Sequence, residues 1–259
     1  MEKQNNQSSA ILISLGFLLR KAFLKLKEAG GNLLLSVFFI VCLIFVLFFF
    51  LGILYYSIIS IKIVQTNYLF TFRLIWQIIF YLATYALGVI AQVLIIKSLV
   101  SPKEKFNVII SSLKTYFLNF LCLSIFINII FLVCYLPFYG GIFLLLFESQ
   151  VLGACSIIIS LILNLLAVIF LIMSPFILIE KNKWFIEAVK ESFKIASNNF
   201  WDIVIKLVII CISLVLLLNI STLLCIILPT LGAIISIILF IPVILLVFSY
   251  LFAFYQYLK

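Results

Sequence analysis

The side chains that perform most acid–base, nucleophilic and metal chemistry are scarce in this sequence. It contains no histidine, the side chain that most often serves as a general base or metal ligand near neutral pH. Its cysteines lie inside apolar runs without a C-x-x-C pair (Cys42, Cys122, Cys134, Cys155, Cys211, Cys225). Such cysteines are typical of small buried hydrophobic residues rather than metal or redox sites. We therefore expect no catalytic residue, no metal and no cofactor, and predict that the protein is not an enzyme.

A few polar residues within or beside apolar stretches are the remaining candidates. Asp202 and Lys206 are four residues apart, which places both on one helix face. We expect a structural ion pair, with a gate or ligand contact as the alternative. Pro175 lacks an N–H group and should kink or loosen the end of its helix. Amides and hydroxyls in these stretches should bond between helices, with a polar substrate path as the alternative (Gln77, Gln92, Asn128, Asn164, Asn219, Ser124, Ser156, Ser160, Ser213).

The chain that must position these residues is exceptionally apolar. Of its 259 residues, 67% are hydrophobic and 10% are charged, and its mean hydropathy is +1.44. A soluble domain is about half apolar and about one quarter charged. The composition excludes a soluble enzyme, a disordered chain and a secreted disulfide scaffold. It predicts an all-α, polytopic integral membrane protein.

Six stretches are long enough to cross a hydrocarbon core of ~30 Å, which requires about 20 residues in a helix. They cover 33–60, 74–96, 116–136, 152–179, 200–228 and 231–255. The connection between the third and fourth stretches begins at Pro137 and includes the apolar run 142–147. Because this run is too short to cross, we expect it to form an interfacial or re-entrant segment.

Basic residues are distributed unevenly between the two sides of these spans. Fourteen of the 17 lie before the first span, in the second and fourth connections, or at the C-terminus (Lys3, Arg20, Lys21, Lys25, Lys27, Lys97, Lys103, Lys105, Lys114, Lys181, Lys183, Lys190, Lys194, Lys259). The first connection contains only Lys62 and Arg73. Lys and Arg concentrate in cytoplasmic segments, so we predict a cell-membrane protein with both termini in the cytoplasm. The net charge of +9 then reflects topology and does not indicate nucleic-acid binding.

A short pattern, K-x4-N followed by Leu or Phe, precedes three of the spans. It occurs at Lys27–Asn32, Lys114–Asn119 and Lys194–Asn199. Apolar residues upstream keep helical spacing, as do Phe185, Val189 and Phe193. We predict a single transmembrane domain, 1–259, built from three repeats (about 11–100, 101–180 and 181–259). Each repeat would consist of a cytoplasmic amphipathic helix followed by a transmembrane hairpin.

The basic residues of these surface helices are candidates for contact with the bilayer and with anionic phospholipids. They are Lys181, Lys183, Lys190, Lys194, Lys103, Lys105, Lys114, Arg20, Lys21 and Lys25. Charge that only sets topology would produce the same pattern and is the alternative. Pro175, Asn199, Asp202 and Lys206 are the candidates for a structural or gating role.

The stretch 174–201 carries a more specific signature. A proline near the end of a span is followed by an acidic residue, an E-A-x-K-x-S helix and an N-F-W entry to the next span. The matching positions are Pro175, Glu180, Glu187, Ala188, Lys190, Ser192, Asn199, Phe200 and Trp201. This stretch resembles the glycerophosphoryl diester phosphodiesterase membrane domain and related uncharacterised six-span families. The resemblance implies a six-span domain without the separate catalytic domain, whose histidines are missing here.

These observations favour a non-enzymatic membrane scaffold or accessory domain whose basic surface helices face lipid. The alternatives are a small-solute transporter or channel, with the amides lining its path, and an anionic-lipid-binding protein. The residues do not specify a protein partner or an oligomeric state.

Overall fold

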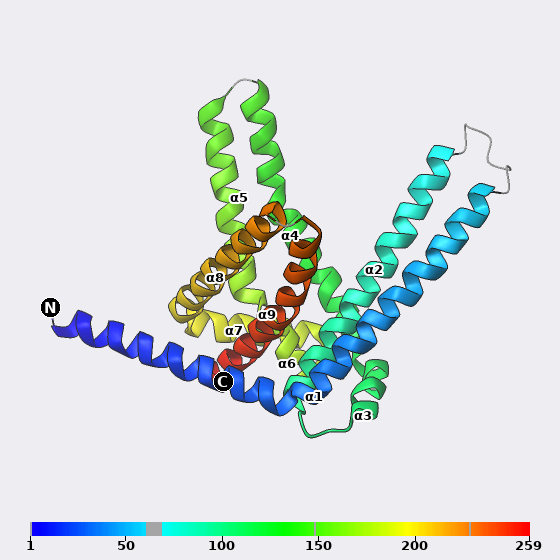
Figure 1. The fold of residues 1–259 in the computed structure, drawn as a ribbon. Helices are drawn as coiled ribbons and strands as arrows, with labels where there is room; N and C mark the ends of the chain where they lie inside the picture. Colours follow the sequence, from blue (N-terminus) through cyan, green and yellow to red (C-terminus); the bar gives the residue numbers. More distant parts are fainter. Residues whose placement is uncertain (1, 61–68, 148, 228) are drawn as a thin grey trace. The chain divides into compact units, whose positions relative to one another are not determined.

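The computed structural model describes residues 2–60, 69–147, 149–227 and 229–259. Within these ranges every regular element is an α-helix (Figure 1): α1 (Glu2–Ser60), α2 (Leu69–Val100), α3 (Phe106–Ser111), α4 (Leu113–Phe147), α5 (Gln150–Leu171), α6 (Ser174–Glu180), α7 (Phe185–Asn198), α8 (Phe200–Ile227) and α9 (Pro229–Leu258). The described residues contain five helical stretches that are long and apolar enough to span a membrane. There are six if α7 and the start of α8, which meet at 96°, form one span. The predicted all-helical, multipass membrane class is confirmed for these residues.

The chain divides into two units. One comprises Met1–Lys27 and Cys122–Lys259, and the other comprises Glu28–Leu121. In the second unit, α1 and α2 form an antiparallel hairpin. Phe48 contacts Phe80 with ring centroids 5.1 Å apart, and the hydroxyls of Ser36 and Ser98 lie 3.2 Å apart near the base.

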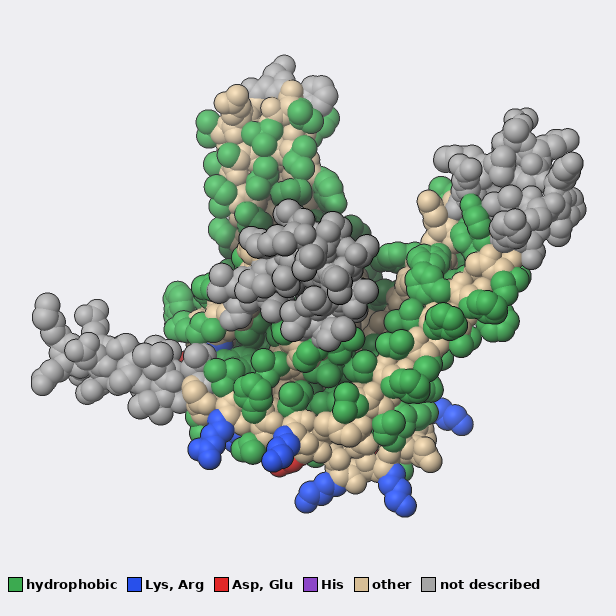
Figure 2. Space-filling model, viewed as in Figure 1, with side chains coloured by type: hydrophobic (Ala, Val, Ile, Leu, Met, Phe, Trp, Pro, Cys, Tyr) green, Lys and Arg blue, Asp and Glu red, His purple; other side chains and the backbone are tan. Residues whose placement is uncertain are grey.

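In the larger unit, α4 and α5 form a second antiparallel hairpin with very close backbones. A Cβ atom added to Gly141 would lie 2.8 Å from the carbonyl oxygen of Gly153, too close for any side chain. Small residues at such crossings allow membrane helices to approach closely. On the face shown in Figure 2, hydrophobic side chains cover the outside of this hairpin. The helices α8 and α9 also pack against each other in this unit.

The expectation of an interfacial or re-entrant segment at 142–147 is wrong. The helix α4 continues through Pro137 to Phe147, so these residues are the last turns of the third spanning helix. A continuous helix satisfies its own backbone polar groups in lipid, whereas an irregular segment does not. Gly141 does not break the helix, and its missing side chain instead provides the contact surface for α5.

The three predicted surface segments differ in structure. The first continues without a break into the span within α1, the second contains only the short helix α3, and the third is the separate helix α7. Because these segments differ, the threefold repeat remains a prediction.

Candidate functional site

The fourth span is interrupted where α5 ends at Leu171 and α6 begins at Ser174. Pro175 lies in the first turn of α6, and its missing N–H leaves the carbonyl of Leu171 without its usual helical donor. The hydroxyl of Ser174 donates to this carbonyl at 2.5 Å. The hydroxyl of Ser192, on α7, donates to the neighbouring carbonyl of Phe170 at 2.6 Å. Both serines are fully buried, so two hydroxyls compensate for the interruption.

The face that the helix α7 buries consists of small side chains. Its buried residues are Ala188, Ser192 and Ala196, while Phe193 is half-exposed and stacks on Phe170 with ring centroids 4.1 Å apart. Ala188 and Ser192 each lie one position before an apolar residue of the predicted helical spacing, Val189 and Phe193 respectively. Small side chains occupy the buried face because they allow α7 to lie close to α5 and α6. The hydrogen bond from Ser192 to Phe170 requires this short distance between the helices.

The turn between α6 and α7 is held by a cluster of charges. The ammonium groups of Lys181 and Lys183 both bind the carboxylate of Glu191, the latter at 2.8 Å. Asn182 has φ of 50°, in the left-handed region that asparagine tolerates better than most residues. Burial raises the pKa of Glu191, but hydrogen bonds from the two lysines outweigh it and hold the pKa below its ordinary value. The same hydrogen bond raises the pKa of Lys183.

The end of α9 packs against α6 within the same unit. Phe176 contacts Phe252 and Tyr255, with ring centroids 5.8 and 6.1 Å apart. Beyond them, the ammonium of Lys259 lies 3.3 Å from the carboxylate of Glu180. These contacts join residues about 75 or more positions apart, and no local pattern in the sequence indicates them.

The structure brings Asp202 and Lys206 together, but their surroundings are unequal. The Lys206 ammonium lies 3.9 Å from the carboxylate, and the side chains are 4% and 49% exposed for Lys206 and Asp202 respectively. The ammonium also lies over the rings of Phe254 and Tyr257, 4.6 and 5.0 Å from their centroids. A desolvated cation gains about 2 kcal/mol over such a ring. Sequence reasoning missed these α9 rings, because spacing within one helix shows nothing of its neighbour.

Asn199 lies at the corner between α7 and α8. Its backbone N–H and its side-chain amide both donate to the carbonyl of Ile195, at 3.2 and 3.1 Å. Its own carbonyl accepts from the N–H of Ile203 at 3.1 Å. Asn199 therefore closes α7 and begins α8, a structural position at the 96° bend.

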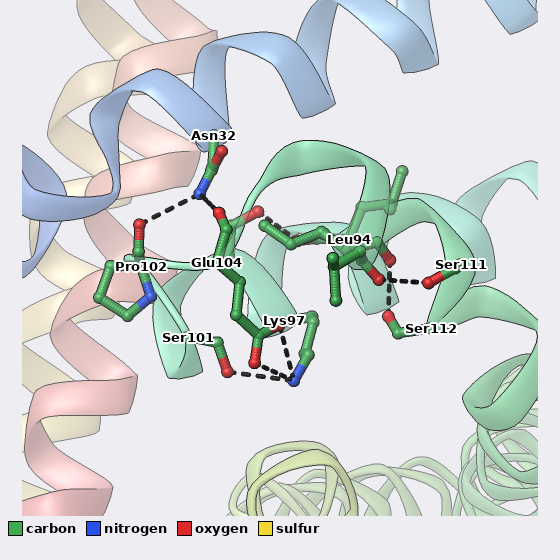
Figure 3. Close-up of polar contacts among 11 residues, drawn as sticks. Asn32, Leu94, Lys97, Ser101, Pro102, Glu104, Ser111 and Ser112 are labelled. Carbon is green, nitrogen blue, oxygen red and sulfur yellow. Dashed lines mark hydrogen bonds and ion pairs between the residues drawn. The ribbon is translucent and has the colours of Figure 1, made fainter.

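The loop between α2 and α3, in the unit Glu28–Leu121, is also pinned (Figure 3). The side-chain amide of Asn32 donates to the carbonyls of Pro102 and Glu104 at 3.1 and 2.9 Å. The ammonium of Lys97 donates to the Ser101 hydroxyl at 3.0 Å and to the Glu104 carboxylate at 3.3 Å. Lys97 thus neutralises the one carboxylate of this loop.

The other predicted lipid-contacting residues differ in exposure. Those exposed are Lys190, Lys194, Lys103, Lys105, Lys114, Arg20 and Lys21, whereas Lys25 is half-buried. Lys21 lies 5.2 Å from the centroid of the Phe17 ring. Lys181 and Lys183 form ion pairs with Glu191. The sequence pattern did not distinguish this structural role from the lipid contact predicted for all the basic residues.

Polar groups within the spans bond chiefly to backbone carbonyls. The hydroxyls of Ser156 and Ser160 cross from α5 to the α4 carbonyls of Pro137 and Cys134, at 2.6 and 2.7 Å. The amide of Asn164 instead donates within its own helix, to the carbonyl of Ser160 at 2.9 Å. Among these three residues, the two hydroxyls bond between helices and the amide bonds within its own helix.

The cysteines do not all pack inside the protein as expected. Cys42, Cys155 and Cys211 are exposed, and Cys122 and Cys134 are half-buried. The side chain of Cys225 lies outside the described residues. In a membrane span, an apolar thiol facing lipid incurs little cost, so burial is not required. Among the described residues, no three Cys, Asp or Glu side chains are grouped so as to hold a metal ion.

Comparisons with protein-family models, curated proteins and solved structures give no significant match. The similarity of 174–201 to the glycerophosphoryl diester phosphodiesterase membrane domain therefore remains an expectation from the sequence.

Proposed function

We propose that this protein is a non-enzymatic scaffold or accessory domain of the cell membrane, with its basic segments on the cytoplasmic face. The observation that carries the proposal is the close contact between α4 and α5. Two features join these helices: the backbones approach closely at Gly141 and Gly153, and the hydroxyls of Ser156 and Ser160 bond to carbonyls of α4. Groups engaged in this way hold the hairpin together and do not line a path for solute.

A transporter is the second candidate, because transport sites often lie at interrupted membrane helices. The interruption between α5 and α6 is such a feature. However, the carbonyls of Phe170 and Leu171 are already bonded by Ser192 and Ser174. An ion would have to replace both hydroxyls, so the arrangement favours a fixed joint over a binding site.

Cysteine accessibility separates the two functions. In a cysteine-free background, Ser160→Cys and Asn164→Cys report on the α4–α5 seam, and Lys103→Cys provides an exposed control. The scaffold predicts that a membrane-impermeant thiol reagent labels Lys103→Cys only, and only from the cytoplasmic side. Labelling of both seam variants from the aqueous phase would support a solute path and contradict the scaffold.

Proteoliposomes containing the wild-type protein provide an independent test. We expect flux of small ions and labelled solutes to equal that of protein-free vesicles. Saturable flux that Ser192→Ala abolishes would favour the transporter.

A further inference from the structure

The helix α7 is tied closely to α6 and α8 by short connections. The four-residue turn 181–184 connects it to the fourth span, and Asn199 alone separates it from α8. Its inner face is closed against the protein by Ala188, Ser192 and Ala196. If α8 crosses the membrane from its first turn, the outer face of α7 lies at the depth of the lipid headgroups.

The outer face of α7 changes from apolar to basic around the helix. Ile186 and Phe193, seven residues apart, are 47% and 49% exposed on one side. Lys190 and Lys194, four residues apart, are exposed beside them. Helices that lie in a membrane interface have this combination of apolar and basic residues.

The other charges near α7 leave this face net positive. Lys181 and Lys183 compensate Glu191, and Lys259 compensates Glu180. Glu187 is exposed on the same helix and offsets only part of the charge of Lys190 and Lys194.

Exposed tryptophans flank α7. Trp184 precedes its first turn and Trp201 follows the corner at Asn199, with 51% and 73% of their surfaces exposed. Tryptophan is enriched at the headgroup level of membranes, where its ring meets both apolar and polar surroundings.

We propose that the outer face of α7, defined by Ile186, Lys190, Phe193 and Lys194, is a binding surface for anionic phospholipid headgroups. This inference rests on the proposed membrane location and cytoplasmic orientation of the proposed function. Ile186 and Phe193 enter the acyl boundary while the two ammonium groups reach lipid phosphates. An acidic soluble protein would suit the lysines but would leave the apolar half of this face without a partner.

Quenching of Trp184 by brominated lipids tests this surface. The full chain, with Trp76→Phe and Trp201→Phe so that Trp184 is its only tryptophan, is reconstituted into phosphatidylcholine vesicles. Part of the lipid is replaced by brominated phosphatidylglycerol or by brominated phosphatidylcholine. We expect stronger quenching by phosphatidylglycerol, and a preference that weakens as salt rises. Replacing both Lys190 and Lys194 by Gln should reduce the preference for phosphatidylglycerol by about fivefold per lysine. The limit of this reduction is equal quenching by the two lipids.

Two control variants make the result specific. Lys190→Arg with Lys194→Arg keeps the charge and should keep the preference. Lys103→Gln with Lys105→Gln removes the same charge from the loop before α3 and should leave Trp184 quenching unchanged. An equal loss of the phosphatidylglycerol preference in the Lys103→Gln, Lys105→Gln variant would show that the lipid is attracted to the protein's overall positive charge. That result would overturn the proposal for α7.

Equal quenching of the wild-type protein by both lipids would also overturn the proposal. Quenching by neither lipid would place α7 away from the bilayer and would favour a soluble partner instead. These outcomes are separate from the scaffold function, because thiol labelling and solute flux do not depend on lipid preference.

Discussion

The α2–α3 loop and the α6–α7 turn each connect a helical hairpin to a shorter helix, but different contacts hold them in place. The α2–α3 loop, Ser101–Lys105, is held from outside by Asn32, which lies about 70 residues earlier and binds two of its carbonyls. The α6–α7 turn, 181–184, is held from within, because two of its own lysines bind Glu191 of the helix that follows. The first arrangement leaves Lys103 and Lys105 exposed.

The contrast shows that similar charge patterns do not imply similar roles for lysine. Lys103 and Lys105 in the α2–α3 loop are exposed, whereas Lys181 and Lys183 in the α6–α7 turn form ion pairs within the protein. The α6–α7 turn also depends on Ser192, which anchors α7 to the interrupted fourth span. We therefore expect substitutions within α7 to destabilise the α6–α7 turn more than substitutions within α3 destabilise the α2–α3 loop.

The largest effect is expected for Ser192→Val, which tests the anchor of the second connection. This substitution removes the hydroxyl that donates to the buried carbonyl of Phe170, and the larger valine side chain crowds a closely packed face. We expect the free energy of unfolding to fall by about 2–4 kcal/mol. Thermal unfolding of the purified protein in detergent measures it. Ser197→Val, at an exposed site on the same helix, should change little, and a comparable loss there would contradict the anchor.

The next effect is expected for Asn32→Ala, which removes the external support of the first connection. Loss of two hydrogen bonds to backbone carbonyls should destabilise the loop locally by about 1–3 kcal/mol. Limited trypsin digestion should then cleave faster after Lys103, while cleavage after Lys183 stays constant. Asn107→Ala, at an exposed position in α3, is the control. Unchanged cleavage after Lys103 would mean that Asn32 does not hold this loop.

A smaller, pH-dependent effect should distinguish the second connection. Because the pKa of Glu191 lies below its ordinary value of 4.5, the stabilisation is present above that value. It is lost as the pH falls through the lowered pKa. Unfolding midpoints measured from pH 7 to pH 3 should therefore fall more steeply at the acid end for the wild-type protein than for Glu191→Gln. Parallel profiles would show that the lysines do not stabilise the ionised carboxylate.

The smallest effect is expected for Glu104→Gln in the first connection. Its ion pair with Lys97 is partly exposed, and such pairs contribute about 0.2–1 kcal/mol. Asn32 binds the backbone carbonyl of Glu104, which this substitution retains. Trypsin cleavage after Lys103 should thus change far less than in Asn32→Ala. A loss of protection equal to that of Asn32→Ala would make the side chain, and not the backbone contact, the main support.

Particular residues show how far sequence reasoning reaches. The spacing of Asp202 and Lys206 was sufficient to predict that they meet, because one helix determines both positions. Pro175 indicated the end of a helix for a similarly local reason. The spacing of Phe185, Val189 and Phe193 correctly predicted a helix. It did not indicate which face of that helix is buried, because this depends on the segments that pack against it.

The apolar composition and the lengths of the apolar runs determined the helical, membrane-spanning class, since a chain in lipid must satisfy its backbone hydrogen bonds internally. The tertiary structure decided which polar groups are used inside the protein. It paired Ser192 with the Phe170 carbonyl and placed the Lys206 ammonium over the rings of Phe254 and Tyr257. It also joined Lys181 and Lys183 to Glu191 while leaving Lys190 and Lys194 exposed. Composition acts on every residue of the chain alike, whereas each of these bonds depends on which other segment is folded against it.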